Sequence, residues 1–243
     1  MVLLHGWGMH SGIWNNVVKA LQGQFRVTVL DLPGHGYSRA IPAPGSLADL
    51  SRMVAKAAPL APAVWIGWSL GGLIAQRLAI DCPERVRKLA LIGCSPCFVR
   101  RPTWAPAMEL TVLLQFAEGL RRDYRSTIKR FLALEVHGSE HATEQLRQMR
   151  DLIFHHGEPD PLSLQAGLDI LREADLRTNV HRIGCPTLLM LGRRDTLVPV
   201  AAGPATAALI PDTRLHVFDR AAHAPFFSHP REFIDCLSAF LHD

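Results

Sequence analysis

The chain has 243 residues, of which 48% are hydrophobic, and a formal net charge of +4 at pH 7. This length fits one α/β domain with an insertion, and the apolar content is enough for a buried core, which argues against a disordered chain. The charge is too small to indicate a nucleic acid, although it would suit an acidic partner. Neither an apolar run long enough for a membrane span nor a leader-like start is present, so we expect a soluble, monomeric, cytoplasmic protein with no membrane contact.

The five cysteines are an odd number for a chain of this length, which argues against a disulfide framework. Cys94 and Cys97 have C-x-x-C spacing, but no second Cys or His pair follows at a distance typical of zinc sites. We therefore expect these two side chains to serve packing, with a metal or redox role as the weaker alternative.

Strand and helix patterns alternate in the first part of the chain. The strand patterns are Val2–Leu4, Phe25–Leu30, Val64–Ile66 and Lys88–Ile92. Helix patterns cover Ile13–Leu21, a segment that opens with a capping box at Ser46 and Asp49 and runs to Ala58, and the residues after Ser69. Short apolar strands that alternate with helices predict a mostly parallel sheet covered by helices on both faces.

The periodicity changes after Cys97. Residues 98–179 contain only helical patterns, namely Met108–Leu120, Tyr124–Val136 and Glu144–Ile153, with breaks at Gly138 and at Pro159–Pro161. Strand patterns resume at Pro186–Leu191 and Leu215–Phe218, and a helix from Pro230 to Leu241 closes the chain. The sequence therefore predicts a core built from residues 1–97 and 180–243, interrupted by a helical cap of residues 98–179.

Residues 63–73, AVWIGWSLGGL, place one serine between two glycines where an apolar strand meets a helix. In the pattern G-x-S-x-G, here Gly67, Ser69 and Gly71, the chain reverses so sharply that the flanking positions need almost no side chain. The following helix directs its free N–H groups and the positive end of its dipole at the same point. Five such residues also arise by chance in glycine-rich loops, but the strand and helix around them predict that Ser69 is a nucleophile.

A serine hydroxyl is a weak nucleophile, so it requires a base and a group that orients the base. Among twelve histidines, His223 lies in a loop of small residues, AAHAP, after the last predicted strand. Such a loop can bring an imidazole to the carboxyl edge of a parallel sheet. His229 is the second candidate, although beside Pro230 we expect it to cap the last helix. Of the others, His216 falls inside a predicted strand, and His155 and His156 fall in the helical segment.

The orienting acid should also follow a strand. Asp195 does so, in LGRRD. Asp219 is the competing choice, but it stands only four residues before His223 and would have to double back to reach the ring. The chain order Ser69, Asp195, His223 is the order typical of a serine nucleophile on a strand–turn–helix elbow.

Two backbone N–H groups are expected to stabilise an oxyanion beside Ser69. One is that of Leu70, directly after the nucleophile, and the other should come from the loop after the first strand. We predict Trp7 for this second donor, because Gly6 and Gly8 allow its backbone to approach a ligand closely. A tight turn without a catalytic role is the alternative for this loop.

Taken together, these segments resemble the α/β-hydrolase superfamily over nearly the whole chain. The resemblance rests on HGWG at His5–Gly8, DLPGHGYS at Asp31–Ser38, GWSLGG at Gly67–Gly72 and AAHAPF at Ala221–Phe226. GWSLGG, SPCF at 95–98, RFLAL at 130–134 and residues 221–230 further resemble the carboxylesterase family of biotin synthesis, which demethylates pimeloyl-[acyl-carrier protein] methyl ester. The resemblance implies an α/β-hydrolase fold with an inserted helical cap, and ester hydrolysis without a metal or organic cofactor.

The resemblance also implies an acyl site and a surface for acyl-carrier protein. We expect Trp68, Phe131 and Phe226 to wall the acyl site beside Trp7 and Leu70. The expected carrier-protein contacts are basic residues of the cap: Arg121, Arg125, Lys129, Arg130, Arg147 and Arg150. Arg121, Arg125 and Lys129 recur at helical spacing and would share one face, which the resemblance favours as the docking surface; an ordinary solvated charged face is the alternative.

Two departures from the family pattern stand out. Family members usually begin with one or two strands before the HG loop, whereas this chain starts in that loop's own strand, so we expect a shortened sheet or an incomplete start. Ser126 and Thr143 occupy cap positions where the family carries basic residues, and the neighbouring Arg125 and Arg150 could compensate.

Other functions remain open on the sequence. A generalist carboxylesterase or a carbon–carbon bond hydrolase would use the same three residues on another substrate, because the cap sets the substrate. Haloalkane and epoxide hydrolases carry an aspartate where Ser69 stands, which disfavours those reactions. A non-catalytic receptor on the same scaffold is a further alternative, and the complete Ser, Asp and His set argues against it.

Overall fold

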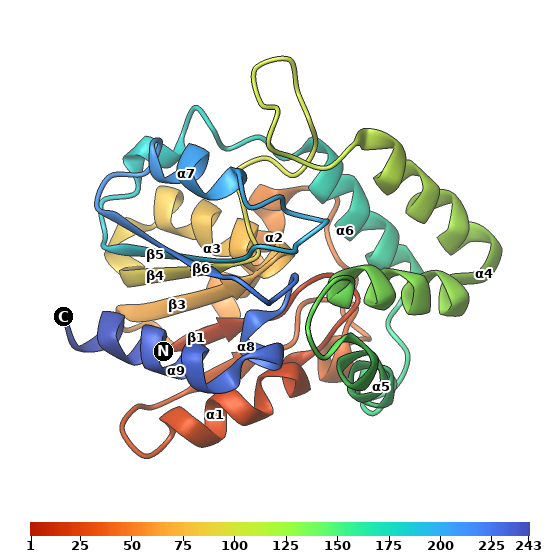
Figure 1. Ribbon diagram of the computed structural model, residues 1–243, viewed down its shortest axis with the longest axis horizontal. Coiled ribbons are helices and arrows are strands. Elements are labelled where there is room, and N and C mark those ends of the chain that lie inside the picture. The colour runs from red at the N-terminus through yellow and green to blue at the C-terminus, as the bar shows by residue number, and fades with distance from the viewer.

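The computed structural model describes residues 1–243 and contains one sheet of six parallel strands in the order β2-β1-β3-β4-β5-β6 (Figure 1). The strands are β1 (Val2–Leu4), β2 (Thr28–Leu30), β3 (Ala63–Trp68), β4 (Val86–Ile92), β5 (Thr187–Gly192) and β6 (Thr213–Phe218). Each predicted strand is present, but β2 is shorter than the predicted Phe25–Leu30. Only the last three residues of the predicted segment pair with β1, with Val2 opposite Thr28 and Leu4 opposite Leu30.

Helices cover both faces of the sheet. The α-helices of the core are α1 (Asn15–Leu21), α2 (Leu47–Ala57), α3 (Leu70–Asp81), α7 (Ala202–Ala207), α8 (Pro225–Ser228) and α9 (Pro230–His242). In Figure 1, α1 and α9 lie below the sheet, whereas α2, α3 and α7 lie above it. Short 3₁₀ helices at Ser11–Trp14, Gly36–Ser38, Pro83–Arg85 and Val180–Arg182 complete the connections. The predicted parallel sheet with helices on both faces is therefore confirmed.

Local capping sets the start of α2 as the sequence predicts. Ser46 is its N-cap, and the hydroxyl of Ser46 accepts a hydrogen bond from the Asp49 N–H at 3.1 Å. His229 occupies the N-cap position of α9, but its side chain makes no capping hydrogen bond, so the expectation that it caps this helix is wrong. The Nδ1 atom of His229 instead lies 2.8 Å from the Ser228 hydroxyl.

The segment between β4 and β5, residues 93–186, is here called the helical insertion. It contains α4 (Leu110–Val136), α5 (Ala142–Ile153) and α6 (Pro161–Glu173), which lie to the right of the sheet in Figure 1. The sequence patterns did not predict α6, which begins directly at the predicted Pro159–Pro161 break. Asp160 caps it by accepting a hydrogen bond from the Ser163 N–H, and Pro161 suits the first turn because it needs no amide donor there.

The long helix α4 is interrupted at Asp123, whose φ of −156° and ψ of 93° are not helical. The Asp123 carboxylate accepts hydrogen bonds from the Ser126 N–H and hydroxyl, so it acts as an N-cap for the second half of α4. Two helical stretches, as predicted, therefore meet at this residue. The predicted single basic face is wrong, because Arg121 precedes the interruption whereas Arg125 and Lys129 follow it.

One hydrophobic core joins the sheet to the insertion. It contains almost completely buried side chains of β1, β3 and β4. Apolar residues of α4, α5 and α6 belong to the same cluster. The insertion is therefore packed onto the sheet rather than tethered beside it. None of the helices is both long enough and apolar enough to span a membrane.

Candidate active site

Ser69 stands between β3 and α3 with φ 54° and ψ −118°, a positive φ that is rare for a residue other than glycine. Its N–H donates to the Ile92 carbonyl at 2.9 Å, which ties this turn to the end of β4. Strained backbone of this kind persists only where the surroundings enforce it, and it is concentrated at functional sites.

The two elbow glycines are required by close approaches of backbone to backbone. A Cβ on Gly67 would lie 2.4 Å from the Gly71 carbonyl oxygen, and a Cβ on Gly71 would lie 2.5 Å from that of Leu4. Neither neighbour is the end of a flexible side chain, so neither can move aside cheaply. The spacing of glycines around Ser69 therefore follows from the packing of α3 against β1 and β3.

Asp195 and His223 are brought together from the loops after β5 and β6. The Asp195 Oδ2 atom lies 2.7 Å from His223 Nδ1, and both side chains are almost completely buried. The other oxygen of Asp195 accepts hydrogen bonds from the N–H groups of Leu197 and Val198, at 2.8 and 2.9 Å. The acid is thus held from both sides, and it fixes the orientation of the imidazole ring.

The opposite ring nitrogen of His223, Nε2, is buried and has no hydrogen-bond partner. Two contacts fix the His223 backbone near the elbow. The Trp68 indole N–H donates to the His223 carbonyl at 3.0 Å, and a Cβ on Gly93 would lie 2.9 Å from His223 Nδ1. His223 is therefore held against the ends of β3 and β4, with one nitrogen free to accept a proton.

The loop after β1 approaches the elbow directly. A Cβ on Gly6 would lie 3.0 Å from the Trp68 ring and 3.2 Å from the Cβ of Ser69. The backbone N–H of Trp7, the next residue, makes no hydrogen bond within the protein. Leu70 is the first residue of α3, and first-turn N–H groups have no acceptor inside their own helix. Two donors without acceptors thus flank Ser69.

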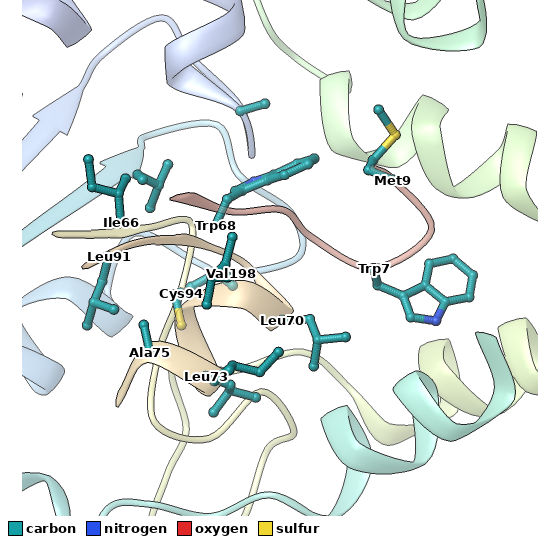
Figure 2. Close-up of a cluster of buried hydrophobic side chains, with 14 of the residues drawn as sticks. Trp7, Met9, Ile66, Trp68, Leu70, Leu73, Ala75, Leu91, Cys94 and Val198 are labelled. Atoms are coloured by element: carbon teal, nitrogen blue, oxygen red, sulfur yellow. The ribbon is translucent and has the colours of Figure 1, made fainter. Parts of the chain in front are cut away.

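The Trp7 side chain is held by α6. Its indole N–H donates to the Leu164 carbonyl at 2.8 Å, and the nitrogen points toward this teal helix in Figure 2. A Cβ on Gly167 would lie 2.7 Å from the Trp7 ring and 3.5 Å from the Leu70 side chain. The insertion therefore packs against both residues that are predicted to supply the oxyanion donors.

His5, in the same loop, is a buried neutral imidazole. Its Nδ1 donates to the Gly6 carbonyl at 2.8 Å, and its Nε2 accepts from the Leu32 N–H at 2.9 Å, a pairing that only the uncharged ring allows. Burial lowers the pKa of His5 to about 3, and the neighbouring His35 adds to this shift. His5 therefore serves to fix the loop that carries Trp7.

The three predicted wall residues are buried. Phe131 packs edge-on against Trp7 with ring centroids 4.7 Å apart, and Trp68 lies 5.6 Å from the His223 ring. Phe226 contacts Trp68 but also Trp14 and Phe233, so it belongs equally to the core on the α9 side. Trp68 and Phe131 adjoin the candidate catalytic residues most directly.

The other acid and histidines that the sequence offered as candidates contact residues away from the Asp195–His223 pair. Asp219 is exposed and pairs with Arg193 at 2.7 Å, while His216 lies 3.0 Å from Glu232. His156 packs against Tyr37 and His10, with ring centroids 4.5 and 4.4 Å apart. None of these side chains touches the Asp195–His223 pair.

All six predicted carrier-protein residues, Arg121, Arg125, Lys129, Arg130, Arg147 and Arg150, are exposed. Arg125 forms an ion pair with Glu158, and Arg147 lies 3.7 Å from Glu144. The other four form no ion pair within 4.0 Å. A groove of about 770 Å³ runs between the two halves of α4, lined by residues that include Phe116, Arg122 and, of these six, Arg130. Ser69 and His223 do not line this groove.

All five cysteines are free, and no group of His, Cys, Asp or Glu side chains is arranged to hold a metal ion. Cys94 packs against Gln76, whose amide lies 3.1 Å from its sulfur. Burial raises the pKa of the Cys94 thiol, so it is not a reactive thiolate.

Comparison with known proteins agrees with the geometry. Residues 1–230 match the family model of the α/β-hydrolase fold. The chain belongs to the α/β-hydrolase family. The pimeloyl-[acyl-carrier protein] methyl ester esterase of Nitrosomonas europaea is 44% identical over 98% of this chain and 94% of its own, and the enzyme of that name from Xylella fastidiosa is 43% identical over 99% and 94%. These matches confirm the resemblance seen in the motifs.

Solved structures of α/β hydrolases agree in fold. An esterase from Exiguobacterium antarcticum superposes with a TM-score of 0.88 at 23% identity, covering 100% of this chain and 91% of its own. A hydrolase from Pseudomonas aeruginosa superposes with a TM-score of 0.82 at 27% identity, covering 100% and 89%.

Some residues around the site could not be found from sequence patterns. Gly93 and Gly167 are isolated glycines outside any motif. Glu135 falls at helical spacing on the apolar face of α4, but its neighbours Asp195 and His223 come from distant parts of the chain. A positive φ at Gly93, 49°, is visible only in the structure. The signal in the sequence is weak, because an isolated glycine inside a helical pattern indicates only that some close approach exists.

Proposed function

We propose that this chain is a serine carboxylesterase that hydrolyses the methyl ester of pimeloyl-[acyl-carrier protein] to the free acid and methanol, in biotin synthesis. The observation that carries the proposal is the similarity over 98% of the chain to an esterase of that name. The buried Asp195–His223 pair beside the strained Ser69 supports it, since this arrangement suits acyl transfer.

The proposed mechanism uses only groups of this chain. His223 Nε2 accepts the Ser69 proton as the serine oxygen attacks the ester carbonyl, and Asp195 stabilises the imidazolium that forms. The N–H groups of Leu70 and Trp7 stabilise the oxyanion. His223 then returns the proton to the methoxide, methanol leaves, and water hydrolyses the acyl-enzyme by the same steps to release the acid.

The first test is Ser69→Ala. Triad members act as a unit, so kcat for a methyl ester should fall by about 10⁴-fold or more while the fold is unchanged. The measurement is methanol release from pimeloyl-[acyl-carrier protein] methyl ester, with circular dichroism as the check on folding. Rescue of a biotin auxotroph lacking this esterase by the parent, but not by the variant, would support both the chemistry and the pathway. Turnover in the folded variant would contradict the assignment of Ser69.

Acyl-carrier protein is the proposed partner, and basic residues of the insertion are its proposed contacts. Arg125 and Arg130 lie exposed in the second half of α4, and Arg130 lines the groove that separates the two halves of this helix. Exposed charges of one sign steer an oppositely charged partner and affect its association more than its chemistry. The effect of removing these charges on the rate should therefore depend on whether the substrate is attached to a carrier protein.

Charge reversal tests the partner separately from the chemistry. Arg125→Glu with Arg130→Glu should lower kcat/KM for the carrier-protein ester by about tenfold to a hundredfold, because the reversed charges repel an acidic partner. Each tenfold corresponds to about 1.4 kcal/mol of lost attraction. A small p-nitrophenyl ester should be hydrolysed as before. Arg26→Glu with Arg231→Glu, two exposed arginines of the core, is the matched control. Equal losses on both substrates would exclude the docking role.

A further inference from the structure

Glu135, in the last turn of α4, is a buried acid that the proposed mechanism does not use. Its side chain is fully buried, and neither carboxyl oxygen has a hydrogen-bond partner. A carboxylate without water, donors or a counter-ion is strongly destabilised, so such a group takes up a proton instead. Burial, and after it the negative charge of Asp195, raise the pKa of Glu135 well above its usual value.

Glu135 is hydrogen-bonded to His223 through its main chain, and its carboxyl group is near enough to Asp195 for the two charges to interact. Its main-chain oxygen accepts a hydrogen bond from the His223 N–H at 3.0 Å, which joins the end of α4 to the loop after β6. Of the two acids, Asp195 has three hydrogen-bond partners and Glu135 has none on its side chain. When two neighbouring carboxyl groups have such different surroundings, the hydrogen-bonded one is the ionised acid and the one without partners is neutral.

The remaining charged groups around this turn lie toward the surface. Arg194 donates to the Gly138 carbonyl at 2.8 Å, and Arg220 pairs with Glu140 at 3.1 Å. His229 lies 3.9 Å from the same Glu140. Asp195 and His223 are therefore the buried titratable groups that face Glu135.

We infer that Glu135 is a positioning residue for His223 that works as an uncharged acid: its main chain holds the His223 loop, and its carboxyl group fills the space beside Asp195 without adding a second negative charge. This inference rests on the proposed catalytic roles of Ser69, Asp195 and His223. A second buried negative charge would favour the protonated imidazole, which cannot accept the Ser69 proton. With Glu135 neutral, Asp195 alone determines how readily His223 takes up a proton.

Kinetics of Glu135→Ala and Glu135→Gln test the positioning role on a p-nitrophenyl ester. Alanine leaves a cavity beside Asp195, so kcat should fall about tenfold, the equivalent of about 1.4 kcal/mol, with KM unchanged because Glu135 does not touch the substrate. Glutamine has the same shape without charge and should restore kcat. An alanine variant with the kcat of the parent would overturn the positioning role.

The pH profile tests the uncharged state. The acid limb of kcat/KM should have the same midpoint in the parent and in Glu135→Gln, because neither carries a charge at this position. A midpoint lower by about one pH unit in the glutamine variant would show that Glu135 is ionised in the parent and would overturn the inference. Glu144→Gln, at an exposed position of α5, is the matched control.

A direct measurement separates this inference from the proposed function. In the infrared spectrum at neutral pH, the C=O band of a protonated carboxylic acid should be present in the parent and reduced in Glu135→Gln, whether or not the protein is an esterase. If the variant does not fold, NMR titration of the parent with carboxyl-¹³C glutamate decides instead. One buried glutamate should remain protonated at neutral pH, and full ionisation of every glutamate would overturn the inference.

Discussion

The carboxyl edge of the sheet and the outer surface of the helical insertion differ in how their residues are held. At the sheet edge, Gly67 and Gly71 lie where an added Cβ would come within 3 Å of backbone atoms, and Asp195 and His223 are buried and hydrogen-bonded to each other. On the insertion, Arg125 and Arg130 are exposed, and the helix that carries them is interrupted at Asp123. Contacts inside the chain therefore define the chemistry, whereas a role for the outer charges depends on a partner.

The largest expected effect tests the sheet edge. Asp195→Asn should lower kcat by about 10⁴-fold, because an amide holds the imidazole in the wrong tautomer and does not stabilise the imidazolium. The measurement is kcat on a p-nitrophenyl ester, where carrier-protein contacts play no part. Asp219→Asn, at the competing acid that pairs with Arg193 on the surface, is the control and should retain activity. A larger loss in the control than in Asp195→Asn would reverse the assignment of the acid.

The next effect concerns the pH dependence of stability at the same edge. His5 has a pKa near 6.5 when exposed and about 3 in the folded protein, so the unfolded chain binds more protons between these values. The free energy of unfolding should therefore fall as the pH is lowered from about 6.5 toward 3, and His5 should account for about 2 kcal/mol between pH 7 and pH 5.

Urea unfolding at several pH values measures this contribution. His5→Gln should be less stable at neutral pH but should show a smaller pH dependence than the parent. His216→Gln, at a partly exposed ring beside Glu232, should leave most of the pH dependence in place. An unchanged slope in His5→Gln would show that His5 is not the group responsible.

The smallest expected effect is at the contact between the helical insertion and the sheet edge, where Gly167 of α6 lies against Trp7. Alanine at position 167 favours the helix by about 1 kcal/mol, but its Cβ would lie 2.7 Å from the Trp7 ring. Gly167→Ala should therefore displace Trp7, a predicted oxyanion donor, and lower kcat/KM by about tenfold, the equivalent of about 1.4 kcal/mol of lost transition-state stabilisation. Gly184→Ala, where nothing lies within 4 Å of the added atom, is the control. Equal activity in the two variants would show that the contact between α6 and Trp7 does not affect catalysis.

Local patterns were sufficient for the elbow and for the order of elements. The turn at Ser69 depends on residues within two positions of it, and the alternation of short apolar strands with helices reports burial on both faces of a parallel sheet. For the same reason, Asp195 and His223 could be selected as polar residues that follow predicted strands. Because each follows a strand of a parallel sheet, both are expected at its carboxyl edge.

Tertiary packing decided what depended on residues far apart in the chain. A helical period does not reveal that Asp123 caps the second half of α4. The same period places Glu135 on the face of Ile128, Phe131 and Leu132, but it does not show that the carboxyl group is left without a hydrogen-bond partner. Gly167 and Trp7 are 160 positions apart, yet their contact joins the insertion to the oxyanion loop. The sequence by itself determined the elbow, the fold class and the candidate triad, because short-range backbone sterics and periodic burial are written in neighbouring residues. The burial of the Glu135 carboxyl group without a partner, the break in the basic face and the position of the Trp7 side chain were decided only by tertiary structure, because burial and charge proximity arise when distant segments pack together.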